Sequence, residues 1–127
     1  MDKNSNSLNW FEIPAKDIAR AKKFYETIFK IDMEPMQEMM GMQMVGFPWE
    51  MGSGKANGAL VQSQMHKPST DGCVIYLNAN PEIQKVIDRI EAAGGKIEMP
   101  KTEIPQIGYM AFFIDSEGNK MALHAQD

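Results

Sequence analysis

The sequence has a single cysteine, no long apolar run and no cluster of basic residues. Cys73 has no partner for an internal disulfide, which is typical of a reducing compartment, so we expect a cytoplasmic protein. No apolar stretch approaches the roughly 18 residues of a membrane-spanning helix, and the amino-terminal MDKNSNS is polar, so neither a membrane helix nor a signal peptide is expected. The net charge of −4 argues against nucleic acid or an anionic membrane as a partner.

The remaining composition is that of one globular domain. Of 127 residues, 43% are hydrophobic and 24% are charged, enough apolar material for a core. Methionine is the outlier, with 12 residues, half of them between Met33 and Met44. They are either flexible core filler or a soft wall for an apolar ligand, and both interpretations stay open.

The first part of the chain predicts a strand followed by an amphipathic helix. Leu8–Ile13 alternates as a strand does, and Pro14 ends it. Asp17 occupies an N-cap position. The apolar residues that follow have helical spacing and form one stripe: Ile18, Ala21, Phe24, Tyr25, Ile28 and Ile31.

Short strands and turns complete this first unit. We expect strands at 39–47 and 58–64, joined by a glycine-rich hairpin loop. That loop contains GSGKANG, which lacks the spacing of a phosphate-binding loop and a following helix. The polar stretch 65–72 predicts a hinge. His66 is expected to be an exposed residue of that hinge.

The same order then recurs. Cys73–Leu77 predicts a strand with Cys73 facing the core, and Asn80-Pro81 opens a second amphipathic helix that stops at Gly94-Gly95. Strands are expected at 96–99, 109–114 and 120–124, the last two joined by the turn 115–119. The prediction is one α+β domain over 1–127 with two βαβββ modules, at about 8–64 and 73–126, whose curved mixed sheets surround a cavity.

Three stretches resemble a known superfamily. They are FEIPAKDIARAKKFYETIF in the first module, and IEAAGGKIEMPKTEI and YMAFFIDSEGNKMALH in the second. In this order they resemble the vicinal oxygen chelate superfamily, which includes glyoxalase I, bleomycin-resistance proteins, fosfomycin-resistance proteins and extradiol dioxygenases. The resemblance implies paired βαβββ modules. It also implies a homodimer in which each cavity takes one module from each subunit.

Metal-dependent members of that superfamily hold a divalent ion with His and Glu ligands from the first and last strands of each module. Counted from the helix cap and the turn, those positions here fall at Trp10, near Leu60, near Val74 and at Ala122. None of these side chains is an ordinary metal ligand. The resemblance therefore implies no cofactor, and a divalent metal is expected only if the ligands have been relocated.

Strand alternation predicts which side chains face the cavity instead. Trp10 and Glu12 share that face of the first strand, Tyr76 and Asn78 that of the fifth, and His124 that of the last. With Tyr109 they are the candidate ligand-binding residues, the aromatic rings stacking on a planar ligand and Glu12 meeting a cationic or hydrogen-bonding group. Each also has a structural interpretation, as core filler or as a solvated strand end.

Two functions follow from this set. The preferred one is metal-independent binding of a small organic molecule in the inter-module cavity. The alternative is a glyoxalase-like lyase or isomerase, either with relocated metal ligands or with Glu12 of one subunit and His124 of the other as an acid–base pair. The identity of the ligand is not encoded in any recognisable motif.

Overall fold

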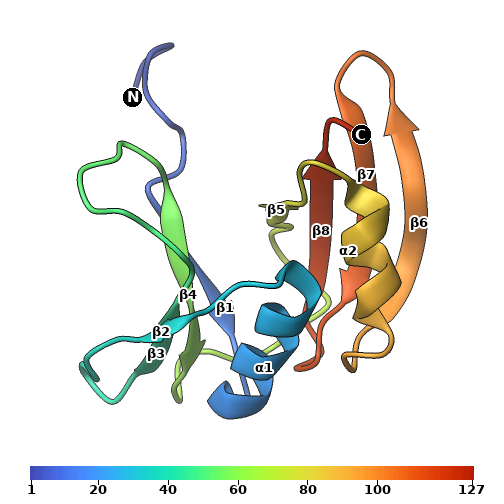
Figure 1. Ribbon diagram of the computed structural model, residues 1–127. Coiled ribbons are helices and arrows are strands. Elements are labelled where there is room, and N and C mark those ends of the chain that lie inside the picture. The colour runs from blue at the N-terminus through green and yellow to red at the C-terminus, as the bar shows by residue number, and fades with distance from the viewer.

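The chain forms two four-stranded sheets, with the first helix between them and the second helix in front of the second sheet in Figure 1. The computed structural model describes residues 1–127. The first module contains β1 Trp10–Pro14, α1 Ile18–Phe29, β2 Glu34–Pro35, β3 Gln43–Gly46 and β4 Asn57–Gln62. The second contains β5 Tyr76–Asn78, α2 Ile83–Ile90, β6 Lys96–Ile104, β7 Gly108–Ile114 and β8 Lys120–Ala125. The predicted α+β class and the repeated βαβββ order are confirmed.

The two sheets have the same topology. Their strand orders are β1-β4-β3-β2 and β5-β8-β7-β6, and in each the first strand of the module pairs in parallel with the last. The other pairings are antiparallel. The internal repeat seen in the sequence is therefore a repeat of sheet topology.

Helix α1 begins where the sequence places its cap. The Asp17 side chain accepts a hydrogen bond from the Arg20 N–H at 3.1 Å, and Lys30 ends the helix in the left-handed region at φ 53°. Helix α2 follows Asn80-Pro81 after one residue, with Glu82 as its N-cap. Neither helix is long and apolar enough to cross a membrane.

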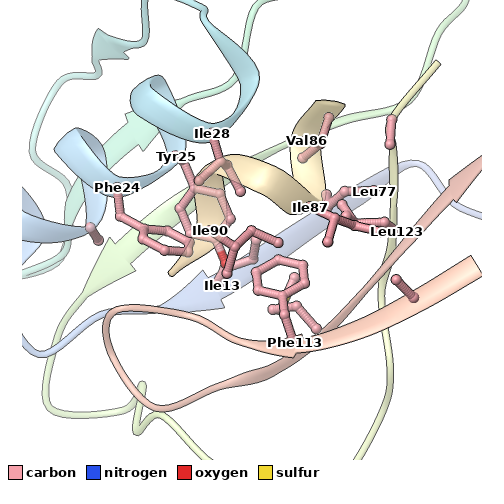
Figure 2. Close-up of a cluster of buried hydrophobic side chains, with 14 of the residues drawn as sticks. Ile13, Phe24, Tyr25, Ile28, Leu77, Val86, Ile87, Ile90, Phe113 and Leu123 are labelled. Carbon is pink, nitrogen blue, oxygen red and sulfur yellow. The ribbon is translucent and has the colours of Figure 1, made fainter. Parts of the chain in front are cut away.

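Both modules contribute to one hydrophobic core. It contains 20 buried residues, drawn from both helices and from the helix-facing sides of both sheets. Figure 2 shows α1 and α2 side chains meeting those of the strands beneath them. Tyr25, Phe24 and Phe113 are the largest fully buried side chains. Because neither half has a separate core of this size, the halves are packed as one unit.

Several observed strands differ from the predicted ones. β3 covers only Gln43–Gly46 of the expected 39–47, and β2 at Glu34–Pro35 was not predicted. β5 begins only at Tyr76, where pairing with β8 begins, and Cys73 is exposed rather than core-facing. β6 continues through Pro100 to Ile104. It is an edge strand whose register is irregular around the proline, so the missing N–H interrupts no central ladder.

Each sheet has a second face, turned away from the helices, which we call its outer face. On the first sheet it carries Trp10 and Glu12, with a separate small cluster of Met42, Met44, Ala59 and Val61. On the second sheet it carries Tyr76, Asn78, Met110, Phe112, Ala122 and His124. Since both helix-facing sides share one core, the two outer faces point in different directions within one chain.

Candidate functional site

The outer face of the first sheet holds a chain of hydrogen-bonded side chains. Trp10 Nε1–H donates to Glu12 Oε2 at 3.2 Å, and His66 Nε2 lies 2.8 Å from Glu12 Oε1. The other ring nitrogen, His66 Nδ1, lies 2.7 Å from Ser63 Oγ. Indole, carboxylate, imidazole and hydroxyl are therefore linked in one row.

The strand pairing explains how these residues meet. Glu12 is the register partner of Ala59, and the alternation that places Ala59 on the outer face also places Ser63 there just after β4. A bridge between Ser63 and His66 turns the chain back, so the imidazole reaches Glu12. The His66 side chain is only 15% exposed. The expectation of an exposed hinge histidine is wrong, because 54 residues separate the pair in the sequence and only the fold joins them.

The outer face of the second sheet holds three other candidates. Tyr76, Ala122 and Phe112 form one cross-strand row, in which the Tyr76 and Phe112 rings meet edge to face at 6.1 Å. Asn78 and His124 are partners in the next row. His124 Nε2 lies 3.1 Å from the Ile107 carbonyl oxygen, and Asn78 Oδ1 accepts from the Asn80 N–H.

Tyr109 differs from the expectation that it joins Tyr76. On β7 it shares the helix-facing side with Ala111 and Phe113, and there it packs against the core. The Lys101 ammonium lies over its ring at 4.2 Å. Phe112 is the β7 aromatic that stands beside Tyr76.

Within one chain the candidates form two separate groups. Trp10 and Glu12 lie on the first outer face, and Tyr76, Asn78 and His124 lie on the second. Glu12 is paired with His66, so the Glu12–His124 pair is not formed inside a single chain, and pairing between two subunits stays a prediction.

The residues at the superfamily's metal positions do not fit a divalent ion. The Trp10 indole N–H donates hydrogen bonds but has no lone pair for a metal ion, and the Val74 and Ala122 side chains have no atom that can coordinate one. Leu60 faces the core, and its outward neighbours on β4 are Ala59 and Val61. Glu12 and His66 are a hydrogen-bonded pair of ligand-type side chains on the first outer face, where the exposed Glu34 also lies, and no group of three or more such side chains is arranged to hold a metal ion.

A cavity of about 660 Å³ does lie between the modules, on the helix-facing side. Phe11, Phe29 and Phe47 contribute its apolar wall, and Tyr76 and Asn78 border it from the second module. Phe11 points to the opposite side of β1 from Trp10 and Glu12. A cavity between the modules therefore exists, but of the six expected lining residues only Tyr76 and Asn78 border it, and Trp10, Glu12, Tyr109 and His124 do not.

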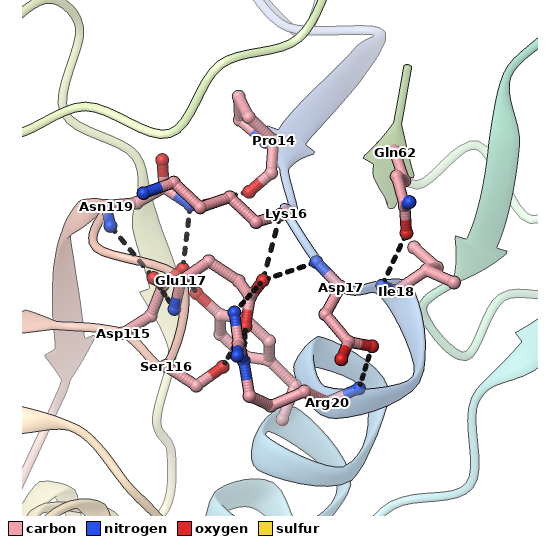
Figure 3. Close-up of polar contacts among 11 residues, drawn as sticks. Pro14, Lys16, Asp17, Ile18, Arg20, Gln62, Asp115, Ser116, Glu117 and Asn119 are labelled. Atoms are coloured by element: carbon pink, nitrogen blue, oxygen red, sulfur yellow. Dashed lines mark hydrogen bonds and ion pairs between the residues drawn. The ribbon is translucent and has the colours of Figure 1, made fainter. Parts of the chain in front are cut away.

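Two of the stretches that carry the superfamily resemblance, one from each module, meet away from both outer faces. Their contacts form what we call the Glu117 cluster: Glu117, Arg20, Asp115 and Asn119 (Figure 3), together with Tyr25. Glu117 Oε1 accepts the N–H groups of Lys16 and Asp17, each at 2.8 Å, and Arg20 Nε donates to Oε2 at 2.7 Å. Burial raises the pKa of this carboxyl, but the hydrogen bonds from Arg20, Asp17 and Ser116 outweigh it, so the pKa is lowered overall.

Asp115 completes the cluster from the same turn. Its Oδ1 accepts the N–H groups of Glu117 and Asn119, and its Oδ2 accepts the Tyr25 hydroxyl at 2.7 Å. Burial first, and then the Asp115 carboxylate, raise the pKa of Tyr25 well above its ordinary value. Asn119 Nδ2 reaches the Pro14 carbonyl at 2.7 Å. The Glu117 cluster therefore joins the two modules and does not line either outer face.

Comparison with known proteins gives one family. The model of the Glyoxalase/Bleomycin resistance protein/Dioxygenase superfamily matches residues 7–123. A curated relative, named "Putative glyoxylase CFP32", from Mycobacterium bovis, is 25% identical over 120 residues, which are 91% of this chain and 44% of that protein. The chain therefore spans less than half the length of this relative.

Solved structures share the fold at low identity. TnmS3, an antibiotic binding protein from Streptomyces sp. CB03234, is 19% identical with a TM-score of 0.67, covering 99% of this chain and 100% of its own. FosX, a fosfomycin resistance protein from Listeria monocytogenes, is 17% identical with a TM-score of 0.62, covering 95% of this chain and 90% of its own.

Proposed function

We propose that this chain, which belongs to the Glyoxalase/Bleomycin resistance protein/Dioxygenase superfamily, binds a small organic molecule without a metal ion. The binding cavity is completed by a second copy of the chain. In it, the first outer face of one copy meets the second outer face of the other, so that Trp10 and Glu12 oppose Tyr76, Asn78 and His124.

The exposure of aromatic side chains on both outer faces carries this proposal. Trp10 is 38% exposed and Tyr76 is 49% exposed, although both stand on sheets whose other faces contribute to the buried core. Large apolar side chains on an exposed sheet face favour a partner or ligand. Hydrogen-bonding groups stand beside each ring, Glu12 next to Trp10 and Asn78 next to Tyr76, as in a site that orients a planar molecule.

The side chains at the metal positions support binding that needs no ion. Trp10, Val74 and Ala122 replace donor groups with apolar surface. An aromatic and aliphatic wall of this kind suits a ligand held by stacking and burial. TnmS3, a structural neighbour named as an antibiotic binding protein, supports a binding role for this fold in general.

A single-tryptophan variant tests the binding. The chain has two tryptophans, so W49F leaves Trp10 as the sole reporter, and W10F leaves Trp49. With ethidium as a cationic planar probe, we expect saturable quenching of Trp10 fluorescence in W49F that is unchanged by excess EDTA. W10F should show no saturable change.

Two results contradict the proposal. One is quenching that disappears with EDTA and returns with a divalent cation, which would restore the metal-dependent alternative. The other is a chain that remains monomeric in analytical ultracentrifugation at the concentrations where the probe binds. E12Q should weaken binding of the cationic probe, and E98Q, which changes an exposed carboxylate on β6, should not.

A further inference from the structure

His66 has both ring nitrogens engaged, which fixes its protonation pattern. An ionised Glu12 only accepts hydrogen bonds, so the nitrogen facing it, Nε2, carries a hydrogen. Ser63 Oγ already accepts the Met65 N–H at 3.1 Å, which leaves its own hydrogen free to donate. In the neutral ring Nδ1 is then the acceptor, and the Ser63 hydroxyl donates to it.

In space, the three side chains form a row of a nucleophile, a base and an orienting carboxylate: Ser63, His66 and Glu12. Ser63 Oγ and His66 Nδ1 are 2.7 Å apart, and His66 Nε2 and Glu12 Oε1 are 2.8 Å apart. Both distances are within the range at which an imidazole activates a hydroxyl while a carboxylate holds the ring. The Trp10 indole N–H fixes the other carboxylate oxygen, so Glu12 is itself held in place.

A polar hollow of about 580 Å³ adjoins the hydroxyl end of this row. Ser63 and His66 line it, together with Lys16 and Lys67, and no carboxylate side chain does. Ten residues form the wall and only one is hydrophobic. The hollow is thus suited to a small, polar, negatively charged molecule, unlike the aromatic outer faces.

We propose that Ser63 is the nucleophile of an esterase site, with His66 as its general base and Glu12 as the positioning carboxylate. The substrate is a small carboxylic ester that carries a negative charge, which Lys16 and Lys67 attract. The hollow is separate from the ligand cavity proposed above, because neither Trp10 nor Tyr76 lines it, and Glu12 is the residue that both proposals use.

The chemistry is a two-step acyl transfer to water. Ser63 Oγ bonds to the ester carbonyl carbon as its proton passes to His66 Nδ1, and the imidazolium is stabilised by Glu12. The C–O bond to the alcohol then breaks, and the alcohol leaves with that proton. Water attacks the Ser63 acyl ester by the same route, releasing the acid and restoring the hydroxyl.

Covalent labelling tests the nucleophile in the wild-type protein. A fluorophosphonate, which loses fluoride when a serine oxygen bonds to its phosphorus, should form an adduct that peptide mass spectrometry locates at Ser63. S63A should remove the adduct, and H66Q should slow its formation by about a hundredfold or more. S53A, at a serine of the exposed hairpin loop, is the matched control and should label as the wild type does.

Hydrolysis tests the substrate class. Mono-(4-nitrophenyl) succinate should be cleaved faster than neutral 4-nitrophenyl acetate, and K67A should remove that preference while K3A keeps it. E12Q should reduce the rate about tenfold at unchanged KM, as expected for a group that acts through His66. Circular dichroism confirms that each variant is folded.

The proposal is overturned if the folded wild type forms no Ser63 adduct, or if urea-unfolded protein labels Ser63 at the same rate. It is also overturned if S63A hydrolyses the succinate ester as fast as the wild type. Quenching of Trp10 by ethidium should survive in W49F/S63A, so failure of the esterase site and failure of the ligand cavity give different results.

Discussion

Glu117 shows how one carboxylate stabilises the contact between two modules. Its side chain is fully buried, beside the half-exposed Arg20 and the N–H groups of Lys16 and Asp17, the two residues that precede α1. A negative charge at a helix amino terminus is favourable, and here it also completes the backbone hydrogen bonding that the helix itself cannot. The folded state therefore favours the charged form of the Glu117 carboxyl group.

E117Q should lower the free energy of unfolding by roughly 2 kcal/mol at neutral pH, because the hydrogen bonds lose their charge. The folded pKa of Glu117 is lowered, so its contribution is present above the ordinary value of 4.5 and is lost as pH falls through the folded pKa. Urea denaturation at pH 7 and pH 3 should show the difference between wild type and E117Q shrinking in acid. E98Q, an exposed glutamate, should show no difference at either pH.

Some residue-level features were predictable and others were not. Asp17 was identifiable as a helix cap because capping is decided within one turn of the chain. The His66–Glu12 contact was not, because it depends on the parallel pairing of β1 with β4 and on the turn that follows. The face of Tyr109 depends on the register of β7 against β8, which alternation alone does not set.

At the level of elements, the close approach of β1 and β4 positions the Glu12–His66 pair. Gly58 is the register partner of Phe11, and a Cβ at Gly58 would overlap the Phe11 carbonyl oxygen and ring. A side chain there must separate the two strands. The absence of a side chain at this position is therefore a condition for the hydrogen-bonded row on the outer face.

G58A should destabilise the protein by at least about 2 kcal/mol, because the overlap involves backbone as well as ring atoms. It should also slow fluorophosphonate labelling of Ser63, since Glu12 moves relative to β4. G46A is the matched control, because its added Cβ would meet chiefly the flexible Met36 side chain at 3.3 Å. Thermal denaturation that does not distinguish the two variants would contradict this explanation.

The sequence predicted the kind and order of elements better than their ends. Apolar periodicity identified both helices and most strands, because each has one buried face. β5 was predicted too long, since Cys73–Ile75 has strand-like composition but precedes the pairing with β8. β6 was predicted too short, since a proline ends a central strand but is tolerated at an edge.

At the level of the whole molecule, the halves share one core and several polar contacts. Arg89 of α2 donates to the Ile28 carbonyl of α1 at 2.6 Å, and the Glu117 cluster joins the second module's turn to the first module's helix. Separating the halves would expose the helix-facing sides of both sheets. The βαβββ module therefore repeats as a pattern of strand pairing, but one module is not expected to be stable without the other.

Unfolding should therefore be a single cooperative transition. Both tryptophans, Trp10 and Trp49, lie in the first half, so their fluorescence reports on that half, while far-ultraviolet circular dichroism reports on both. In urea the two signals should give coincident midpoints and equal m-values. An earlier transition in either signal would mean that the modules unfold independently.

The location of the Glu117 cluster has a consequence for how proteins of this kind are grouped and engineered. Its residues lie within stretches that carry the superfamily resemblance, yet they serve the contact between helix α1 and the turn after β7. Similarity between two chains in these residues therefore indicates a shared fold. Two chains that share this contact between helix and turn can bind unrelated molecules. Transplanting the outer-face side chains of one such chain onto another, with this contact left intact, is the natural way to transfer specificity between them.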